Sequence, residues 1–181
     1  MDYRWLPDRT IPMAYFMLKY ADIKETESIL DFGCAKGFLV KAFRLLNYEA
    51  YGMDISEYAV KHADPDIAEF IDYTMTHKVN WVIAKDVFEH LTEKEVEISL
   101  REIYSTGDKL FLVIPLGDGK KYNVPEYERD ITHTLRQPKE WWEEKFKKQG
   151  WKIKKFDYLV QGIKDNWNHY PKGNGFWILE K

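Results

Sequence analysis

The alternation of short apolar runs with helical patterns constrains the fold of this chain more than any other feature. Strand-like runs occur at residues 28–33, 49–55, 80–87, 109–116, 151–160 and 176–181. The second, third and fourth runs are continuously apolar at their centres, as strands are when both faces of a sheet are covered. Helical patterns between most of the runs supply the right-handed crossovers of a parallel sheet. The sequence therefore predicts a three-layer α/β protein.

The last two runs differ from the others because no helical pattern lies between them. They can therefore pair antiparallel as a hairpin, although their connection at 161–175 is too long for a tight turn. A second irregular stretch covers residues 117–137. Long loops in a compact domain usually serve a function, because ordering them costs entropy and adds little to the core. Both loops are expected to border the functional site on its substrate side.

Two helices have clear sequence signals. Thr92 is followed three residues later by Glu95, the spacing of a capping box, and Gly107 follows the end of the same apolar pattern. A second helix is expected from Pro138 to Gln149, with its tryptophan and phenylalanine facing the sheet.

Length, charge and cysteine content limit the class of protein. A chain of 181 residues is expected to form one domain, over residues 1–181. The single cysteine, Cys34, excludes an intramolecular disulfide, and no stretch reaches the roughly 18 apolar residues of a membrane span. We therefore expect a cytoplasmic protein without a membrane partner. A net charge of -3 gives no general electrostatic reason to bind nucleic acid, so a small-molecule substrate is expected.

A glycine loop follows the first strand in "ILDFGCAKGFLVKAF" (29–43), with glycines at Gly33 and Gly37. Ligands of parallel sheets bind beyond the carboxyl ends of the strands, where glycine lets the backbone approach and the next helix offers free N–H groups. Asp54 ends the second strand, where a carboxylate can accept hydrogen bonds from both hydroxyls of a ribose. Alternatively, Asp54 only caps the helix that follows Ser56. Together, loop and carboxylate predict a nucleotide-type cofactor.

Two cofactor chemistries fit such a loop. A dinucleotide fingerprint has small residues at the first, third and sixth loop positions, which here are Gly33, Ala35 and Phe38. Phe38 disfavours this pattern because the third small residue lets helix and strand pack closely. The second pattern has small residues at every second position, which here are Gly33, Ala35 and Gly37, and the sequence favours it. An NAD-dependent oxidoreductase is therefore kept as the alternative.

Four segments resemble those of class I S-adenosylmethionine-dependent methyltransferases of the small-molecule type, similar to types 11 and 23. "LDFGCAKG" resembles the family's first motif, "YGMDIS" its acidic second motif, "WVIAKDVFEHL" its fourth, and "KLFLVIPL" the strand of its fifth. The resemblance implies a Rossmann-like sheet of about seven strands with an antiparallel C-terminal strand, and S-adenosyl-L-methionine as the cofactor. It also implies an N-terminal lid, here residues 1–27.

The resemblance also implies cofactor contacts. The first-motif loop of the family contacts the methionine part of the cofactor, and the second-motif acid holds the ribose. The implied cofactor-binding residues are Asp31, Gly33, Cys34, Ala35, Gly37, Asp54, Ile55 and Asp86. Ala35 replaces a glycine, which its methyl group allows if φ is negative. The region 64–78 is short around the third strand, and Asp72 is the only candidate there for the adenine contact.

Methyl transfer from a sulfonium requires alignment, and a hydroxyl acceptor also requires a base. The candidate catalytic residues are His133, Asp86 and His90, although either histidine could instead anchor the backbone by a hydrogen bond. Aromatic and cationic side chains of the long loops are candidates for acceptor binding, because they combine buried area with polar groups. These candidates are Tyr122, Arg136, Trp167, His169 and Tyr170.

A metal ion is not part of the favoured prediction. However, Asp86, Glu89 and His90, with His133 from the loop, resemble in spacing the cluster of metal-dependent O-methyltransferases, which leaves a metal site as an alternative. The sequence thus predicts a methyltransferase that acts on oxygen or nitrogen of a small molecule, such as a sugar or a secondary metabolite. A catalytically silent cofactor-binding module is the further alternative. The sequence predicts no oligomeric state.

Overall fold

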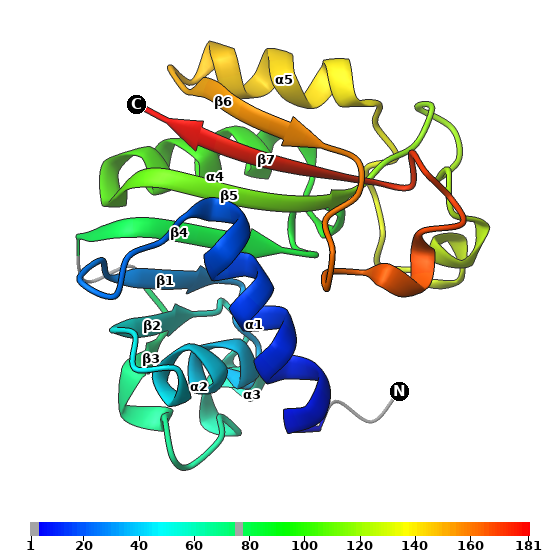
Figure 1. Ribbon diagram of the computed structural model, residues 1–181. Coiled ribbons are helices and arrows are strands. Elements are labelled where there is room, and N and C mark those ends of the chain that lie inside the picture. The colour runs from blue at the N-terminus through cyan, green and yellow to red at the C-terminus, as the bar shows by residue number, and fades with distance from the viewer. Residues whose placement is uncertain (1–3, 75–77) are drawn as a thin grey trace.

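A seven-stranded sheet runs through the protein, with helices on both faces (Figure 1). The computed structural model describes residues 4–74 and 78–181. The strands are β1 (Ile29–Phe32), β2 (Ala50–Met53), β3 (Ile71–Asp72), β4 (Val79–Lys85), β5 (Gly107–Pro115), β6 (Lys152–Asp157) and β7 (Asn174–Glu180). Their order is β3-β2-β1-β4-β5-β7-β6, and β7 runs in the direction opposite to the other six strands. The predicted Rossmann-like α/β fold, including the hairpin of the last two strands, is confirmed.

The helices form the two outer layers. They are α1 (Pro7–Ala21), α2 (Phe38–Leu45), α3 (Glu57–Lys61), α4 (Glu93–Thr106) and α5 (Lys139–Lys148). Helices α1 and α2 cover one face of the sheet and α4 and α5 the other, and the two hydrophobic cores divide accordingly. Neighbouring strand residues alternate between the cores, as Ile29 and Leu30 do in β1. This double coverage explains why the central strands are apolar throughout.

The predicted helix signals act as expected, with one shift. Thr92 accepts a hydrogen bond from the N–H of Glu95, whose side chain in turn accepts from Thr92, so the capping box is present. Pro138 is the N-cap of α5 and not part of its first turn. Trp142 and Phe146 are fully buried against the sheet, as predicted.

Strand β3 is the element that the sequence did not place. It has two residues and pairs with β2 through Gly52 and Ile71, at the edge of the sheet. It lies in the short region 64–78, of which residues 75–77 are outside the described residues. An element of this length carries no period that a pattern could reveal.

The two long loops lie side by side at the edge where the parallel strands end (Figure 1). They contain the short helices η3 (Pro125–Arg129) and η4 (Asp165–Trp167). Asn123 Nδ2 donates to the carbonyl of Lys172 at 2.8 Å, and Tyr127 Oη donates to Asn174 Oδ1 at 2.8 Å, so the loops are joined by side-chain hydrogen bonds. In the described part of the chain, no helix is both long and apolar enough to cross a lipid bilayer.

Candidate active site

The glycine loop between β1 and α2 uses three left-handed residues, Gly33 (φ +77°), Ala35 (φ +49°) and Gly37 (φ +76°). A Cβ atom on Gly33 would come within 2.5 Å of Val87 Cγ2, so both the conformation and the packing require glycine there. The condition of a negative φ at Ala35 is not met, because this alanine takes the conformation of the glycine it replaces. The loop therefore keeps its shape at a local cost in strain.

Asp54 holds the loop from the neighbouring strand. Its Oδ2 accepts a hydrogen bond from the N–H of Ala35 at 2.8 Å, and its Oδ1 accepts from the N–H of Ser56 at 2.8 Å. Ser56, and not Asp54, caps α3 by accepting from the N–H of Ala59. A carboxylate offers about four acceptor positions, so Asp54 retains capacity for a ligand's hydroxyl groups.

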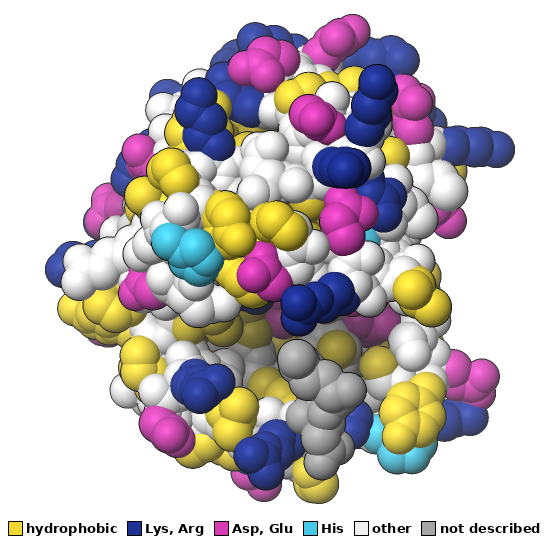
Figure 2. Space-filling model, turned by 90° about the vertical axis from the view of Figure 1, so that its right-hand side faces the viewer, with side chains coloured by type: hydrophobic (Ala, Val, Ile, Leu, Met, Phe, Trp, Pro, Cys, Tyr) yellow, Lys and Arg dark blue, Asp and Glu magenta, His cyan; other side chains and the backbone are white. Residues whose placement is uncertain are grey.

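Two cavities meet at Gly33. The first, of about 330 Å³, lies between the loop and α1, and its lining includes Asp31, Lys85 and Arg9. The second, of about 360 Å³, is more apolar, and its lining includes Asp54, Ile55, Val87 and His90. Each falls within the size range of small-molecule sites. Figure 2 views the carboxyl edge of the sheet, where a hollow crosses the face with acidic and apolar side chains on its floor.

Asp31, at the end of β1, is almost fully buried in the first cavity. Burial raises the pKa of its carboxyl group to about 7; the Asp54 carboxylate adds to this rise, and the Lys85 ammonium opposes it. Cys34, also predicted at the cofactor, is 3% exposed, and burial raises the pKa of its thiol. Its thiol is therefore not an activated nucleophile.

Asp86 follows β4 with a φ of +57° and forms ion pairs with Lys85 and Lys164. Burial alone would raise the pKa of Asp86, but the two ammonium groups hold it well below its usual range. The Lys164 ammonium also donates to Tyr127 Oη and Asn174 Oδ1, each at 3.0 Å. Asp86 is thus a fixed anion that ties the loop 161–175 to β4, and such a weakly basic carboxylate is a poor general base.

A second cluster lies beside this ion pair and contains Glu89, His90 and His133, with one donor atom of each within 4.8 Å of the others. Glu89 is fully buried, and burial together with the Asp86 carboxylate raises its pKa to about 8. His133 Nδ1 lies 2.9 Å from the carbonyl oxygen of Tyr127. Burial and the nearby His90 lower the pKa of His133, which favours the neutral form of its ring.

The predicted acceptor-binding residues do not line either cavity. Tyr122 is 5% exposed and donates its hydroxyl to the carbonyl of Leu135 at 2.8 Å, which anchors the loop. Arg136 pairs with Glu128 at 2.9 Å. The predicted roles of these residues in binding stay predictions.

The three remaining candidates lie in the loop 161–175. The ring of Trp167 packs 5.4 Å from that of Tyr127, and the rings of His169 and Tyr170 lie 4.3 Å apart. Of these three residues, Trp167 is the one that packs on Tyr127, whose hydroxyl accepts a hydrogen bond from Lys164.

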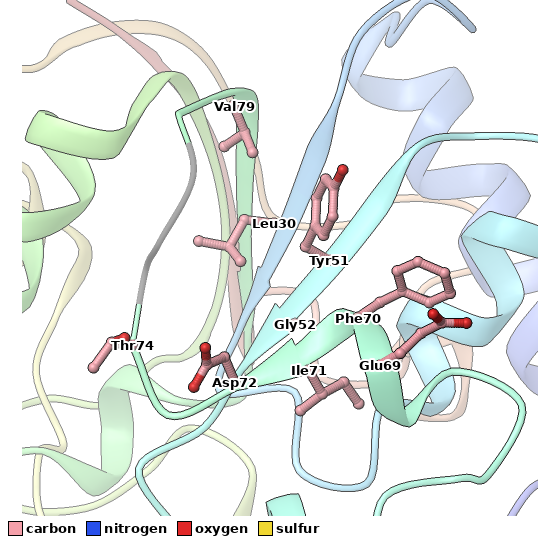
Figure 3. A pocket seen from close by; sticks show the side chains of 9 residues that line it. All are labelled: Leu30, Tyr51, Gly52, Glu69, Phe70, Ile71, Asp72, Thr74 and Val79. Atoms are coloured by element: carbon pink, nitrogen blue, oxygen red, sulfur yellow. The ribbon is translucent and has the colours of Figure 1, made fainter.

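Asp72, the candidate for the adenine contact, neighbours Asp54, whose N–H donates to the carbonyl of Asp72 at 3.2 Å. Its side chain lines a small hollow beside the edge strand, together with Tyr51, Phe70 and Thr74 (Figure 3). The hollow has a volume of about 90 Å³. Ile55, by contrast, lines the second cavity and is 83% exposed, which leaves its side chain open to a ligand. The side chain of Ile55 thus lines the second cavity and that of Asp72 does not, and the adenine contact stays a prediction.

Sequence reasoning missed the two lysines of the Asp86 ion pair. Lys85 stands beside Asp86 in the sequence, but Lys164 comes from a loop 78 positions away (164 minus 86). A lysine in a polar loop normally indicates a solvated surface, so no local pattern distinguishes it.

Comparison with known proteins agrees with this geometry. A family model described as a methyltransferase domain matches residues 11–146, which is more than half of the chain. The chain therefore belongs to this methyltransferase family, and the resemblance predicted from the sequence is confirmed. The comparison with curated proteins gave no match.

Several solved structures share the fold. A SAM-dependent methyltransferase from Archaeoglobus fulgidus has 14% identity and a TM-score of 0.70, with 95% of this chain and 94% of that chain covered. A complex of the Trm112 methyltransferase activator of Haloferax volcanii with a methyltransferase has 16% identity, a TM-score of 0.70, and coverage of 96% and 90%. The small RNA methyltransferase HEN1 has 17% identity and a TM-score of 0.67, with 100% of this chain and 26% of that chain covered.

Proposed function

We propose that the protein transfers the methyl group of S-adenosyl-L-methionine to an oxygen or nitrogen atom of a small molecule, such as a sugar or a secondary metabolite. The family assignment makes the chain a methyltransferase, and the structure from Archaeoglobus fulgidus that shares its fold is SAM-dependent. The observation that carries the proposal is the pair of cavities that meet at Gly33, with Asp54 at the second.

The chemistry of the two cavities fits the two ends of this cofactor. The methionine end carries an ammonium and a carboxylate, and the first cavity offers Asp31 for the former and Arg9 or Lys85 for the latter. The adenosyl end has a ribose and an apolar ring system, and the second cavity offers Asp54 together with Ile55 and Val87. NAD has no zwitterionic end, so the first cavity favours the sulfonium cofactor over the oxidoreductase alternative.

The cofactor supplies an activated methyl group, and the protein supplies alignment. Gly33 gives the backbone a close approach, and Asp54 fixes the sugar. The Asp86 ion pair holds the loop 161–175 against the end of β4. His90, which lines the second cavity, and His133 beside it are the candidates that accept a proton from the acceptor.

The proposal keeps the domain organisation that the sequence predicts. Residues 1–181 act as one methyltransferase-like domain, and the loops 117–137 and 161–175 face the acceptor. Of the predicted lid 1–27, residues 1–3 lie outside the described residues, and residues 4–27 are proposed to cover the methionine end. HEN1 acts on small RNA, but the net charge of -3 favours a small acceptor for this chain. The cytoplasmic location stays a prediction of the sequence.

The test measures transfer of a labelled methyl group from S-adenosyl-L-methionine into a cell extract. The small-molecule, RNA and protein fractions are separated, and the label in each is counted. We expect label in the small-molecule fraction with the wild-type protein and a strong reduction with Asp54→Ala. Label only in the RNA or protein fraction would overturn the acceptor class. No label in any fraction, with cofactor binding intact, would support the silent-module alternative.

A further inference from the structure

We propose that Lys85 is a positioning residue that couples cofactor binding in the first cavity to how firmly the loop 161–175 is held. The coupling runs through Asp86, whose carboxylate forms ion pairs with both Lys85 and Lys164. The proposal rests on the proposed function for the ligand of the first cavity. The arrangement of the three charged residues stands on its own geometry.

Lys85 lies at the boundary between the two cavities. It is the last residue of β4, and its side chain lines the first cavity, whereas the next residue, Asp86, lines the second. Strands β1 and β4 pair in parallel with Asp31 beside Ile83, so Lys85, two residues further along, is on the same face of the sheet as Asp31. The Lys85 ammonium therefore adjoins the place proposed for the methionine end and, on its other side, contacts Asp86.

Two ammonium groups share the carboxylate of Asp86. Lys85 Nζ pairs with Oδ2 and Lys164 Nζ pairs with Oδ1, so the two positive charges lie on the two oxygens of one group. Their side chains are 20% and 9% exposed, and like charges repel more strongly where little water screens them. Each lysine therefore weakens the attraction between the other lysine and Asp86.

The Lys164 ammonium is the point where both long loops meet the end of β4. It donates to Tyr127 Oη in the loop 117–137 and to Asn174 Oδ1 at the start of β7, each at 3.0 Å. Tyr127 Oη also donates to Asn174 Oδ1 at 2.8 Å. A change in the attraction between Lys164 and Asp86 therefore affects both loops.

Cofactor binding changes this balance in one direction. The methionine end carries a carboxylate, and Lys85 is one of the cations that line the first cavity. A carboxylate beside Lys85 offsets the repulsion that this ammonium exerts on Lys164. Lys164 then binds Asp86 without a competing cation, so the loop 161–175 costs more free energy to release. The acceptor loops are thus held most firmly when the cofactor is bound, which is a positive coupling between the two sites.

The experiment measures amide hydrogen exchange in the loop 161–175 of the full-length protein, with and without saturating S-adenosylhomocysteine. In the wild type this product should slow the exchange by about fivefold or more. Lys85→Met should slow it by a similar factor without any ligand, because Lys164 no longer has a competitor for Asp86. Saturating product should then add less than about twofold in this variant. Lys85→Arg keeps the positive charge and should behave like the wild type.

Lys109→Met is the matched control, because Lys109 is also an ion-paired lysine of a strand and contacts Glu27 at 2.9 Å, away from both cavities. It should leave exchange in the loop unchanged. A purely structural role of Lys85 predicts the reverse result, faster exchange in Lys85→Met, because Asp86 loses a counter-ion. That result would overturn the proposal. Equal slowing by the product in the wild type and in Lys85→Met would also overturn it, because the slowing would then come from direct contact with the loop.

Calorimetry with S-adenosylhomocysteine distinguishes this proposal from the proposed function, and thermal unfolding shows that the variants are folded. Product binding by the wild type without any change in loop exchange would overturn the coupling and leave the proposed function intact. A wild type that binds no product would contradict the proposed function. In that case, slower exchange in ligand-free Lys85→Met would still support competition for Asp86, and faster or unchanged exchange would overturn it.

Discussion

The carboxylate of Asp54 accepts a hydrogen bond of 2.8 Å from the backbone N–H of Ala35, so the end of β2 holds the glycine loop that follows β1. The residue predicted to bind the ribose thus also shapes the loop predicted to bind the methionine end. Loss of this side chain should therefore affect the cofactor at two places.

Replacement of Asp54 by alanine should weaken binding of S-adenosylhomocysteine by about tenfold or more. The reason is the loss of charge-assisted hydrogen bonds, each of about 1.5–3 kcal/mol. Calorimetry measures the affinity, and thermal unfolding shows whether the variant is folded. Asp108→Ala is the control, because Asp108 is an exposed carboxylate at the start of β5, at the opposite edge of the sheet from the glycine loop. Equal effects of the two substitutions would remove Asp54 from the cofactor site.

Gly33 should tolerate exchange less well than Ala35. Gly33→Ala places a Cβ at a φ of +77° and 2.5 Å from Val87 Cγ2, and should destabilise the protein by about 1–3 kcal/mol. Ala35→Gly relieves strain at a φ of +49° but raises the conformational entropy of the unfolded chain. The two effects oppose each other, so stability should change by less than about 1 kcal/mol. Urea unfolding measures both. A larger loss for Ala35→Gly than for Gly33→Ala would contradict the loop geometry.

Asp31 should make the cofactor-free protein less stable as the pH rises. Burial raises the folded-state pKa of Asp31 from 3.8 to about 7, so the unfolded chain releases this proton first. The contribution to stability is fully present below the unfolded pKa of 3.8 and is lost progressively up to the folded pKa of about 7.

The isosteric variant Asp31→Asn removes this titration. It should be more stable than the wild type at pH 8 by more than about 1 kcal/mol, which is roughly 2–4 °C in melting temperature for a chain of this size. At pH 4 the two proteins should differ less. The same variant should bind S-adenosylhomocysteine more weakly, because the ammonium of the methionine end loses its carboxylate. A variant that gains stability equally at both pH values would refute the assignment.

Lys164 should anchor the loop 161–175. Its ammonium is paired with Asp86, and its side chain is 9% exposed. Lys164→Met leaves Asp86 with Lys85 alone and should cost about 1–3 kcal/mol of stability, with faster amide exchange across the loop. Lys172→Met changes an exposed lysine of the same loop and is the control. Unchanged exchange in Lys164→Met would show that the ion pair does not hold the loop.

The sheet could be predicted because its central strands are buried on both faces and are therefore apolar without interruption. Val82 and Ile83 are both buried, on opposite faces, and such a run between helical patterns is typical of a parallel strand with helices on either side. The hairpin of β6 and β7 could be predicted because the sequence has no helical pattern between these two strands. Strand β3 could not be found, since two residues at the sheet edge leave no pattern.

The cofactor side of the site was more predictable than the acceptor side. Gly33, Gly37 and Asp54 stand at fixed distances in the sequence because one loop and one strand end position them. The contact between Lys164 and Asp86 depends on how the loop 161–175 packs against the end of β4, which no local spacing records. Likewise, Glu89 has the sequence context of a surface residue before a helix, and only the fold buries it.

The central claim is that the two cavities at Gly33 hold S-adenosyl-L-methionine. Calorimetric titration of the wild-type protein with S-adenosylhomocysteine and, separately, with NAD tests it most directly. We predict saturable one-to-one binding of S-adenosylhomocysteine and none of NAD. Binding of NAD alone, or of neither compound by the folded protein, would contradict this claim.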